Sequence, residues 1–333
     1  MKTITQQEHK QILDIRNEAL SSLPPGVIEK DLLLTQALRT MAGADHDGIR
    51  LVFCGGTCLS KAHHLIERMS EDVDFKLVVP PGLSRTARSK QLSHFKKRLA
   101  SLMTDAGFHV PPEQIVARDE NSYVAMNLHY ESRFSPVASL RPEIKVELNA
   151  RPPVLPTAAR PIRSMVDELI GSPSGEFQME CISVDETLAE KVLSFLRRTA
   201  EARAGRQRAQ YDDRLVRHLY DVRAIVALRK SAVDAQAHKH FATLIHGDAV
   251  QYRNQFPEFE EDPIGQMRQV LKALHHEPEG FERDYIQFVD ELVFGETVPF
   301  AEARTLFVQL AEELLTSATP PSPQSMDPGS SPG

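Results

Sequence analysis

The sequence predicts an α+β fold, with strands and helices mixed in the N-terminal half and helices alone in the C-terminal half. Between residues 49 and 148, short apolar runs end at Gly, Pro or polar residues, as strands do. From Val184 onward, apolar side chains recur at helical spacing. A Pro-rich connector at 152–161 separates the two patterns. We therefore predict a first domain at 1–165, a helical domain at 166–316, and a disordered Ser/Pro/Gly-rich tail at 317–333.

The elements follow in order. In the first domain, runs bounded by turn residues predict strands at 49–54, 73–79, 122–130 and 144–148. Helical spacing predicts helices at 3–22, 26–42, 57–67 and 84–106, the first two separated by Pro24-Pro25. In the second domain it predicts helices at 185–203, 212–230, 233–247, 264–275, 279–294 and 299–316.

Composition indicates a globular protein of the cytoplasm. Hydrophobic residues make up 41% of the 333 residues, and no apolar run approaches the length of about 18 that a membrane span needs. The three cysteines are an odd, small number, which argues against a disulfide framework and for a reducing compartment. We interpret Cys54 and Cys58 as buried thiols rather than a metal pair, because no second Cys or His pair has matching spacing.

Basic residues are concentrated in two runs, although the net charge is −7. Leu83–Arg98 holds six basic residues and no acid, and Arg197–Arg217 holds seven arginines against three acids. These runs either face an anionic substrate or are solvated helix faces.

A strand, a Gly-Gly turn and a helix follow one another at residues 49–67. Gly55 and Gly56 let backbone amides approach a polyphosphate closely, and a helix N-terminus favours an anion there. Thr57 adds a hydroxyl at the same place. The pattern predicts a phosphate-binding turn.

The next predicted strand opens with Asp72-Val73-Asp74. Two carboxylates two residues apart on a strand point to the same face, and their repulsion favours a bound divalent cation such as Mg²⁺. Glu147, on a neighbouring predicted strand, is the candidate for a third acid. The three acids predict a site that holds metal ions and aligns phosphates.

The motifs Gly55-Gly56-Thr57-x-Leu59-x-Lys61 and Arg68-x-Ser70-Glu71-Asp72-x-Asp74-Phe75 resemble the signature of the AbiEii/AbiGii toxin family of nucleotidyltransferases. Further similar motifs are Glu29-Lys30-Asp31, Glu190-Lys191 and Arg217-His218-Leu219-Tyr220-Asp221-Val222. The resemblance covers about residues 26–230. It implies a DNA polymerase β-like nucleotidyltransferase fold with a helical C-terminal half, as in MenT-like toxins of type IV toxin–antitoxin pairs.

The resemblance also implies roles for individual residues. Asp72 and Asp74 would hold Mg²⁺, and Gly56, Thr57 and Ser70 would line the phosphates of an NTP. Lys191 would lie near the triphosphate, and Asp221 would be a further catalytic residue. The plainer interpretations are a surface lysine for Lys191 and an ion pair of Asp221 with Arg217 one helical turn earlier.

Family members bind NTPs, and some add nucleotides to the 3′ acceptor end of tRNA, which stops translation. The resemblance therefore implies an Mg²⁺-dependent toxin acting on RNA, a connection to phage abortive infection, and an AbiEi-type antitoxin as partner. Two alternatives stay open: nucleotidyl or phosphoryl transfer to a protein or small molecule, and nucleotide binding without turnover by a regulator.

Overall fold

The computed structural model describes residues 1–137, 140–172, 175–207, 212–228 and 235–318. The chain forms two compact units. The first contains Met1–Thr187 together with Val289–Thr297, and the second contains Leu188–Phe288 and the chain from Val298 onward. The chain therefore passes from one unit to the other three times.

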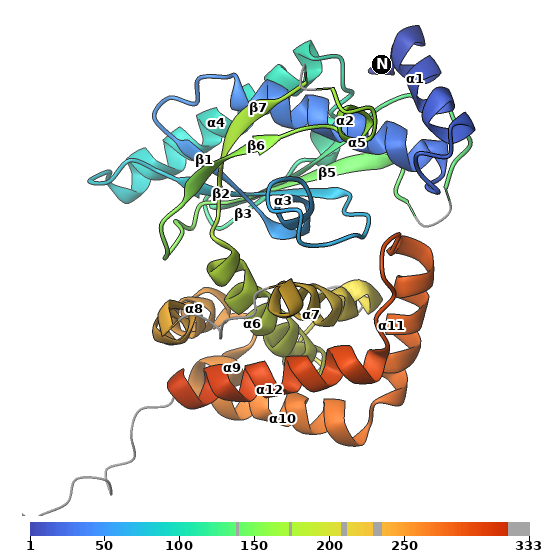
Figure 1. Cartoon of the computed structure of the whole chain (residues 1–333). Coiled ribbons are helices and arrows are strands. Elements are labelled where there is room, and N and C mark those ends of the chain that lie inside the picture. The colour runs from blue at the N-terminus through green and yellow to red at the C-terminus, as the bar shows by residue number, and fades with distance from the viewer. Residues whose placement is uncertain (138–139, 173–174, 208–211, 229–234, 319–333) are drawn as a thin grey trace, which may run out of the picture. The chain divides into compact units, whose positions relative to one another are not determined.

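A seven-stranded mixed sheet forms the centre of the first unit, in the order β3-β4-β5-β2-β1-β7-β6 (Figure 1). Its central strands are β1 (Arg50–Cys54), β2 (Asp72–Val78) and β5 (Glu143–Asn149). β2 runs antiparallel to β1 and parallel to β5. The outer strands are β3 (Val116–Arg118) and β4 (Tyr123–His129) on one side and β6 (Ala158–Ile162) and β7 (Phe177–Cys181) on the other. The four strands predicted at 49–54, 73–79, 122–130 and 144–148 are confirmed as β1, β2, β4 and β5.

Helices α2 (Pro25–Ala42) and α4 (Arg85–Asp105) cover one face of this sheet (Figure 1). Apolar side chains of both helices join Val73, Phe75 and Val146 in one buried core. The short helices α1 (Gln6–Asn17) and α5 (Met165–Leu169) pack against α2. Because strand side chains alternate, burying Val73 and Phe75 leaves Asp72 and Asp74 on the opposite face.

Two details differ from the sequence prediction. The helix after the Gly-Gly turn, α3 (Gly55–Lys61), ends well before Glu67, because His64 takes a positive φ of 50° and the chain then runs irregularly to β2. The first unit also continues past residue 165 to Thr187, since β6 and β7 extend the sheet and Phe53 of β1 pairs with Cys181 of β7.

The second unit, within its described residues, is built from helices. They are α6 (Val184–Arg203, which begins in the first unit), α7 (Arg217–Leu228), α8 (Ala235–Tyr252), α9 (Pro257–Glu261), α10 (Pro263–His276), α11 (Glu279–Leu292) and α12 (Phe300–Ala318), with a 3₁₀ turn at Asp213–Val216. The predicted helical C-terminal half is confirmed. Residues 319–333 of the predicted tail lie outside the described part of the chain.

Cys54, Cys58 and Cys181 are buried cysteines in the thiol form, as interpreted from the sequence for the first two. None of the described helices has both the length and the apolar character of a membrane span.

Candidate active site

The Gly-Gly turn brings the two sequence motifs of the first unit into contact. Gly55 has a φ of +77°, and a Cβ atom there would meet the Asp74 carboxylate, 2.9 Å from its Cγ. A Cβ at Gly56 would lie 2.6 Å from Nη2 of Arg68 and 2.8 Å from Oγ of Ser70. Only glycine therefore lets Asp74, Arg68 and Ser70 pack this closely against the turn.

The two hydroxyls predicted to line phosphates lie side by side. Oγ1 of Thr57 is 2.9 Å from Oγ of Ser70 and also contacts the backbone carbonyl oxygen of Asp72. Thr57 is buried, whereas Ser70 is partly exposed. Ser70 is therefore the hydroxyl that a ligand can reach, and Thr57 fixes its position and the start of β2.

The three predicted acids lie on adjacent positions of β2 and β5. Asp74 is the direct pairing partner of Glu147, and Asp72 is the partner of Lys145. Paired residues on neighbouring strands point to the same face, so the three carboxylates share the sheet face opposite the core. All three are partly exposed on that face.

Basic and hydroxyl groups of the same unit bind two of these acids. Nη1 of Arg141 lies 2.8 Å from Oδ1 of Asp72. Oε1 of Glu147 lies 2.5 Å from Nζ of Lys145 and accepts a 2.8 Å hydrogen bond from the Tyr123 hydroxyl. Burial and then the charge of Glu147 raise the pKa of Tyr123, which keeps its phenol protonated as a donor.

Among the described residues, no group of three His, Cys, Asp or Glu side chains is arranged to hold a metal. Asp72 and Asp74 nevertheless suit Mg²⁺, which needs one or two carboxylates and takes its other ligands from water and substrate phosphates. Asp72 and Asp74 would hold such an ion, and Glu147 lies on the strand beside them.

In the second unit, Lys191 of α6 and Asp221 of α7 form an ion pair, with Nζ 2.6 Å from Oδ2. Lys191 is 6% exposed and Asp221 is 0% exposed. The interpretation of Lys191 as a surface lysine is therefore wrong. The fully buried Asp221 carboxylate therefore holds the Lys191 ammonium group in place.

His218 lies one helical turn before Asp221 and its Nδ1 is buried without a hydrogen-bond partner. Burial, followed by the positive charges of Lys191 and Arg217, lowers the pKa of His218 well below 6.5. The imidazole is therefore neutral at physiological pH and adds no charge beside the Lys191–Asp221 pair.

The family model for the nucleotidyl transferase AbiEii toxin of type IV toxin–antitoxin systems matches residues 36–307, well over half of the chain. The protein belongs to the AbiEii toxin family. Its structure is similar to MenT4, a nucleotidyltransferase toxin from Mycobacterium tuberculosis H37Rv, with a TM-score of 0.55 and 18% identity over 92% of this chain and 89% of that one. At this identity the likeness shows the fold, which confirms the predicted nucleotidyltransferase fold class. No curated protein matches the chain.

The AbiEii motif Glu29-Lys30-Asp31 is a buried support of the site rather than part of its surface. Glu29 accepts a 2.8 Å hydrogen bond from the backbone N–H of Arg133, and Asp31 pairs with Lys61 at 2.6 Å. Lys30 is 0% exposed and pairs with Glu71 at 2.6 Å. One turn of α2 thus fixes three distant segments, including the residue next to Asp72.

Sequence reasoning missed this support, together with Arg141, Lys145 and Tyr123. A signal was available, because three charged residues interrupt the otherwise apolar run from Val27 to Leu34. Charged side chains among buried apolar ones must be paired, but the sequence does not show with what.

Residues near the C-terminal end of the sequence also support the motif that runs from Arg68 to Phe75. The N–H of Met69 donates to the carbonyl oxygen of Leu292 at 2.8 Å, and the N–H of Phe294 donates to that of Glu67 at 3.0 Å. Both strands of this small antiparallel bridge belong to the first unit. The irregular segment before Ser70 is thereby held by Val289–Thr297.

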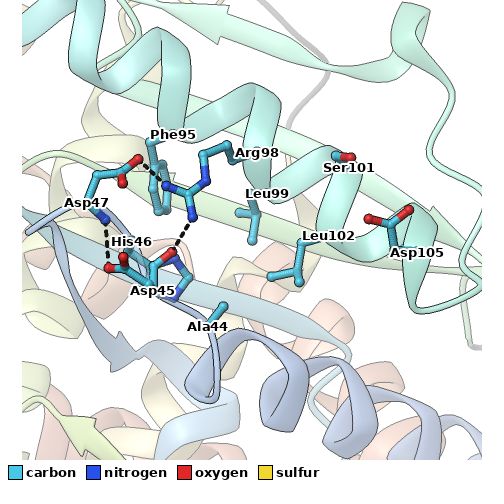
Figure 2. Close-up of a pocket in the computed structure, with 10 residues that line it drawn as sticks. All are labelled: Ala44, Asp45, His46, Asp47, Phe95, Arg98, Leu99, Ser101, Leu102 and Asp105. Carbon is cyan, nitrogen blue, oxygen red and sulfur yellow. Dashed lines mark hydrogen bonds and ion pairs between the residues drawn. The ribbon is translucent and has the colours of Figure 1, made fainter.

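Many basic residues of the two basic runs, 83–98 and 197–217, have partners within the protein. In α4, Arg85 pairs with Glu120, and Arg98 binds Asp47 and the carbonyl oxygen of Asp45 beside the pocket in Figure 2. In the second run the pairs are Arg197 with Asp248, Arg198 with Asp212, Arg203 with Glu277, and Arg206 with Glu258. The exposed pairs among these are weak, so phosphates can compete for such arginines.

Proposed function

We propose that this toxin transfers a nucleoside monophosphate from an NTP to the 3′ hydroxyl of RNA, with the acceptor end of tRNA as target, and so blocks translation. The observation that carries the proposal is the joint position of Asp72, Asp74 and Glu147 on adjacent strands beside the Gly55–Gly56 turn. Family membership supports the transferase chemistry.

The reaction forms a bond between the 3′ oxygen and the α-phosphorus and breaks the bond from that phosphorus to the departing pyrophosphate, while the proton of the hydroxyl passes to solvent water. Bound Mg²⁺ would neutralise the phosphate charge and polarise the α-phosphate. Asp72 and Asp74 would hold the ion. Ser70 would donate a hydrogen bond to a phosphate oxygen, since its partly exposed hydroxyl is fixed by Thr57.

The resemblance of Glu190-Lys191 to a family motif gives Lys191 the role of supplying positive charge to the triphosphate as pyrophosphate departs. Its buried partner Asp221 holds the ammonium group in one orientation through their ion pair. Neutralising Asp221 would therefore impair transfer through Lys191 without removing any contact to the substrate.

A toxin of this type requires restraint, and we propose an AbiEi-type antitoxin as the separate partner in the cytoplasm. Induction of the toxin alone should stop growth, and co-expression of a winged-helix protein encoded beside it should restore growth. Growth arrest that also occurs with the Asp72→Ala protein would contradict a toxicity based on nucleotide transfer.

The deciding experiment measures transfer of label from each of four α-³²P NTPs to total tRNA in the presence of Mg²⁺. Wild-type protein should label tRNA, and Asp72→Ala and Lys191→Ala should each lower the rate at least roughly 100-fold. The matched controls are Asp105→Ala and Lys272→Ala, which remove an exposed acid and an exposed lysine elsewhere.

Chelation of Mg²⁺ should stop the transfer, and the NTP that gives label identifies the nucleotide. Label on protein instead of tRNA would overturn the RNA acceptor and retain the transferase. Absence of any transfer with intact NTP binding would overturn the enzymatic proposal.

A further inference from the structure

Arg141 occupies a position that the nucleotidyl transfer alone does not explain. Its guanidinium lies on Asp72, the acid proposed to hold Mg²⁺, with Nη1 2.8 Å from Oδ1. Its Nε lies 3.9 Å from Oε1 of Glu71. The protein's own cation therefore binds the carboxylate that a metal ion would require.

Buried hydrogen bonds hold the backbone of Arg141 in this position. The backbone N–H of Arg141 donates to Oε2 of Glu71 at 2.8 Å, and its carbonyl oxygen accepts from Nζ of Lys30 at 2.7 Å. Lys30 and Glu71 are themselves paired at 2.6 Å and nearly inaccessible to solvent. The backbone of Arg141 is thus clamped from both sides, so its contact with Asp72 is not an incidental surface pair.

The side chain, in contrast, is accessible. The Arg141 side chain is 37% exposed, whereas Asp72 is 15% exposed. A guanidinium is a rigid fork of five N–H donors that suits phosphate oxygens as well as carboxylates. A fixed backbone with an accessible guanidinium allows the side chain to exchange one anionic partner for another.

We propose that Arg141 is a further residue of the nucleotide site, which neutralises Asp72 in the free protein and binds the polyphosphate when metal and nucleotide enter. This inference rests on the proposed function. Metal alone must compete with Arg141 for Asp72, whereas metal with triphosphate releases the carboxylate and gives the guanidinium a new anion. Metal and triphosphate therefore bind cooperatively, with Arg141 as the coupling residue.

The test uses the full chain and two ligands that do not depend on base identity. Mn²⁺ alone is titrated by electron paramagnetic resonance, and inorganic triphosphate is titrated calorimetrically at saturating Mn²⁺. Arg141→Gln removes the charge, and Arg141→Lys retains it. The matched control is Arg50→Gln, which removes an arginine from an arginine–carboxylate pair of similar length, 2.9 Å to Glu180, at the start of β1.

Arg141→Gln should bind Mn²⁺ alone about 3- to 10-fold more tightly and triphosphate about 10-fold more weakly, as expected for loss of one charge-assisted contact at a partly exposed site. Arg141→Lys should lie between Arg141→Gln and wild type, and Arg50→Gln should equal wild type in both titrations. The affinities for Mn²⁺ and for triphosphate should thus change in opposite directions. A merely structural role of Arg141 would instead weaken the binding of both ligands. Circular dichroism melting verifies that the variants are folded.

Weaker Mn²⁺ binding by Arg141→Gln, or unchanged triphosphate binding, would overturn the inference while leaving the proposed function in place. If wild-type protein bound neither Mn²⁺ nor triphosphate, the metal-dependent function and the inference would fail together. The two failures are thus distinguishable by the behaviour of wild-type protein.

Discussion

Replacing Lys30 by Met should destabilise the first unit strongly, although Met keeps most of the apolar stem. Lys30 is 0% exposed and its ammonium group has two partners, the Glu71 carboxylate at 2.6 Å and the Arg141 carbonyl oxygen at 2.7 Å. Burial would raise the pKa of Glu71, but Lys30 and the Arg141 N–H outweigh it, and the pKa lies below the ordinary 4.5. Lys30→Met therefore removes the nearest positive charge from a buried carboxyl group.

The size of the loss in free energy of unfolding depends on the hydrogen bond that Glu71 retains. Removing one partner of a buried ion pair costs about 3–5 kcal/mol. Glu71 retains the backbone N–H of Arg141 at 2.8 Å, which places the loss near the lower limit, at about 3 kcal/mol. For a unit of this size, such a loss lowers the melting temperature by roughly 6–12 °C.

Thermal unfolding followed by circular dichroism measures this effect. The matched control is Lys10→Met, which removes a pair of nearly the same length, 2.7 Å to Asp14, from an exposed helix face. The control should melt at the wild-type temperature, since solvent screens exposed pairs. A Lys30→Met/Glu71→Leu double variant should recover much of the loss, because no charge is then left buried.

A decrease for Lys30→Met no larger than that of Lys10→Met would refute the argument from burial. If the double variant Lys30→Met/Glu71→Leu lost as much stability as the two single variants together, that result would refute the direct coupling of the pair.

Two further outcomes concern the turn and the second unit. Gly55→Ala should lower both stability and transfer more than Gly82→Ala, because both glycines have positive φ but only a Cβ at Gly55 would displace the Asp74 carboxylate. Equal urea midpoints and equal transfer rates for the two variants would contradict this account. Acidification below pH 6.5 should lower the free energy of unfolding, because the unfolded chain protonates His218 there while burial keeps it neutral in the folded state. His218→Phe should reduce this slope between pH 7.5 and 5.5 in urea titrations, and an unchanged slope would show that other groups cause it.

The sequence by itself determined the local parts of this protein. The alternation of apolar and polar residues fixed which faces of β2, β4 and β5 are buried, and hence that Asp72 and Asp74 share one face. Gly55-Gly56 fixed the sharp turn before α3, because only glycine takes the positive φ of 77° at no steric cost. These features depend on backbone periodicity and sterics within a few residues.

The tertiary structure alone decided which groups neutralise the charges of the site. Asp72 binds Arg141, 69 residues away in the sequence, and Lys30 binds Glu71, 41 residues away. Lys191 and Asp221 come from different helices, and β7 joins the sheet beside β1 from beyond the predicted boundary at residue 165. Such pairings follow from strand order and helix packing, which bring distant segments together. The sequence shows which residues carry a charge, and a buried charge needs a partner. Only the tertiary structure determines which residue that partner is.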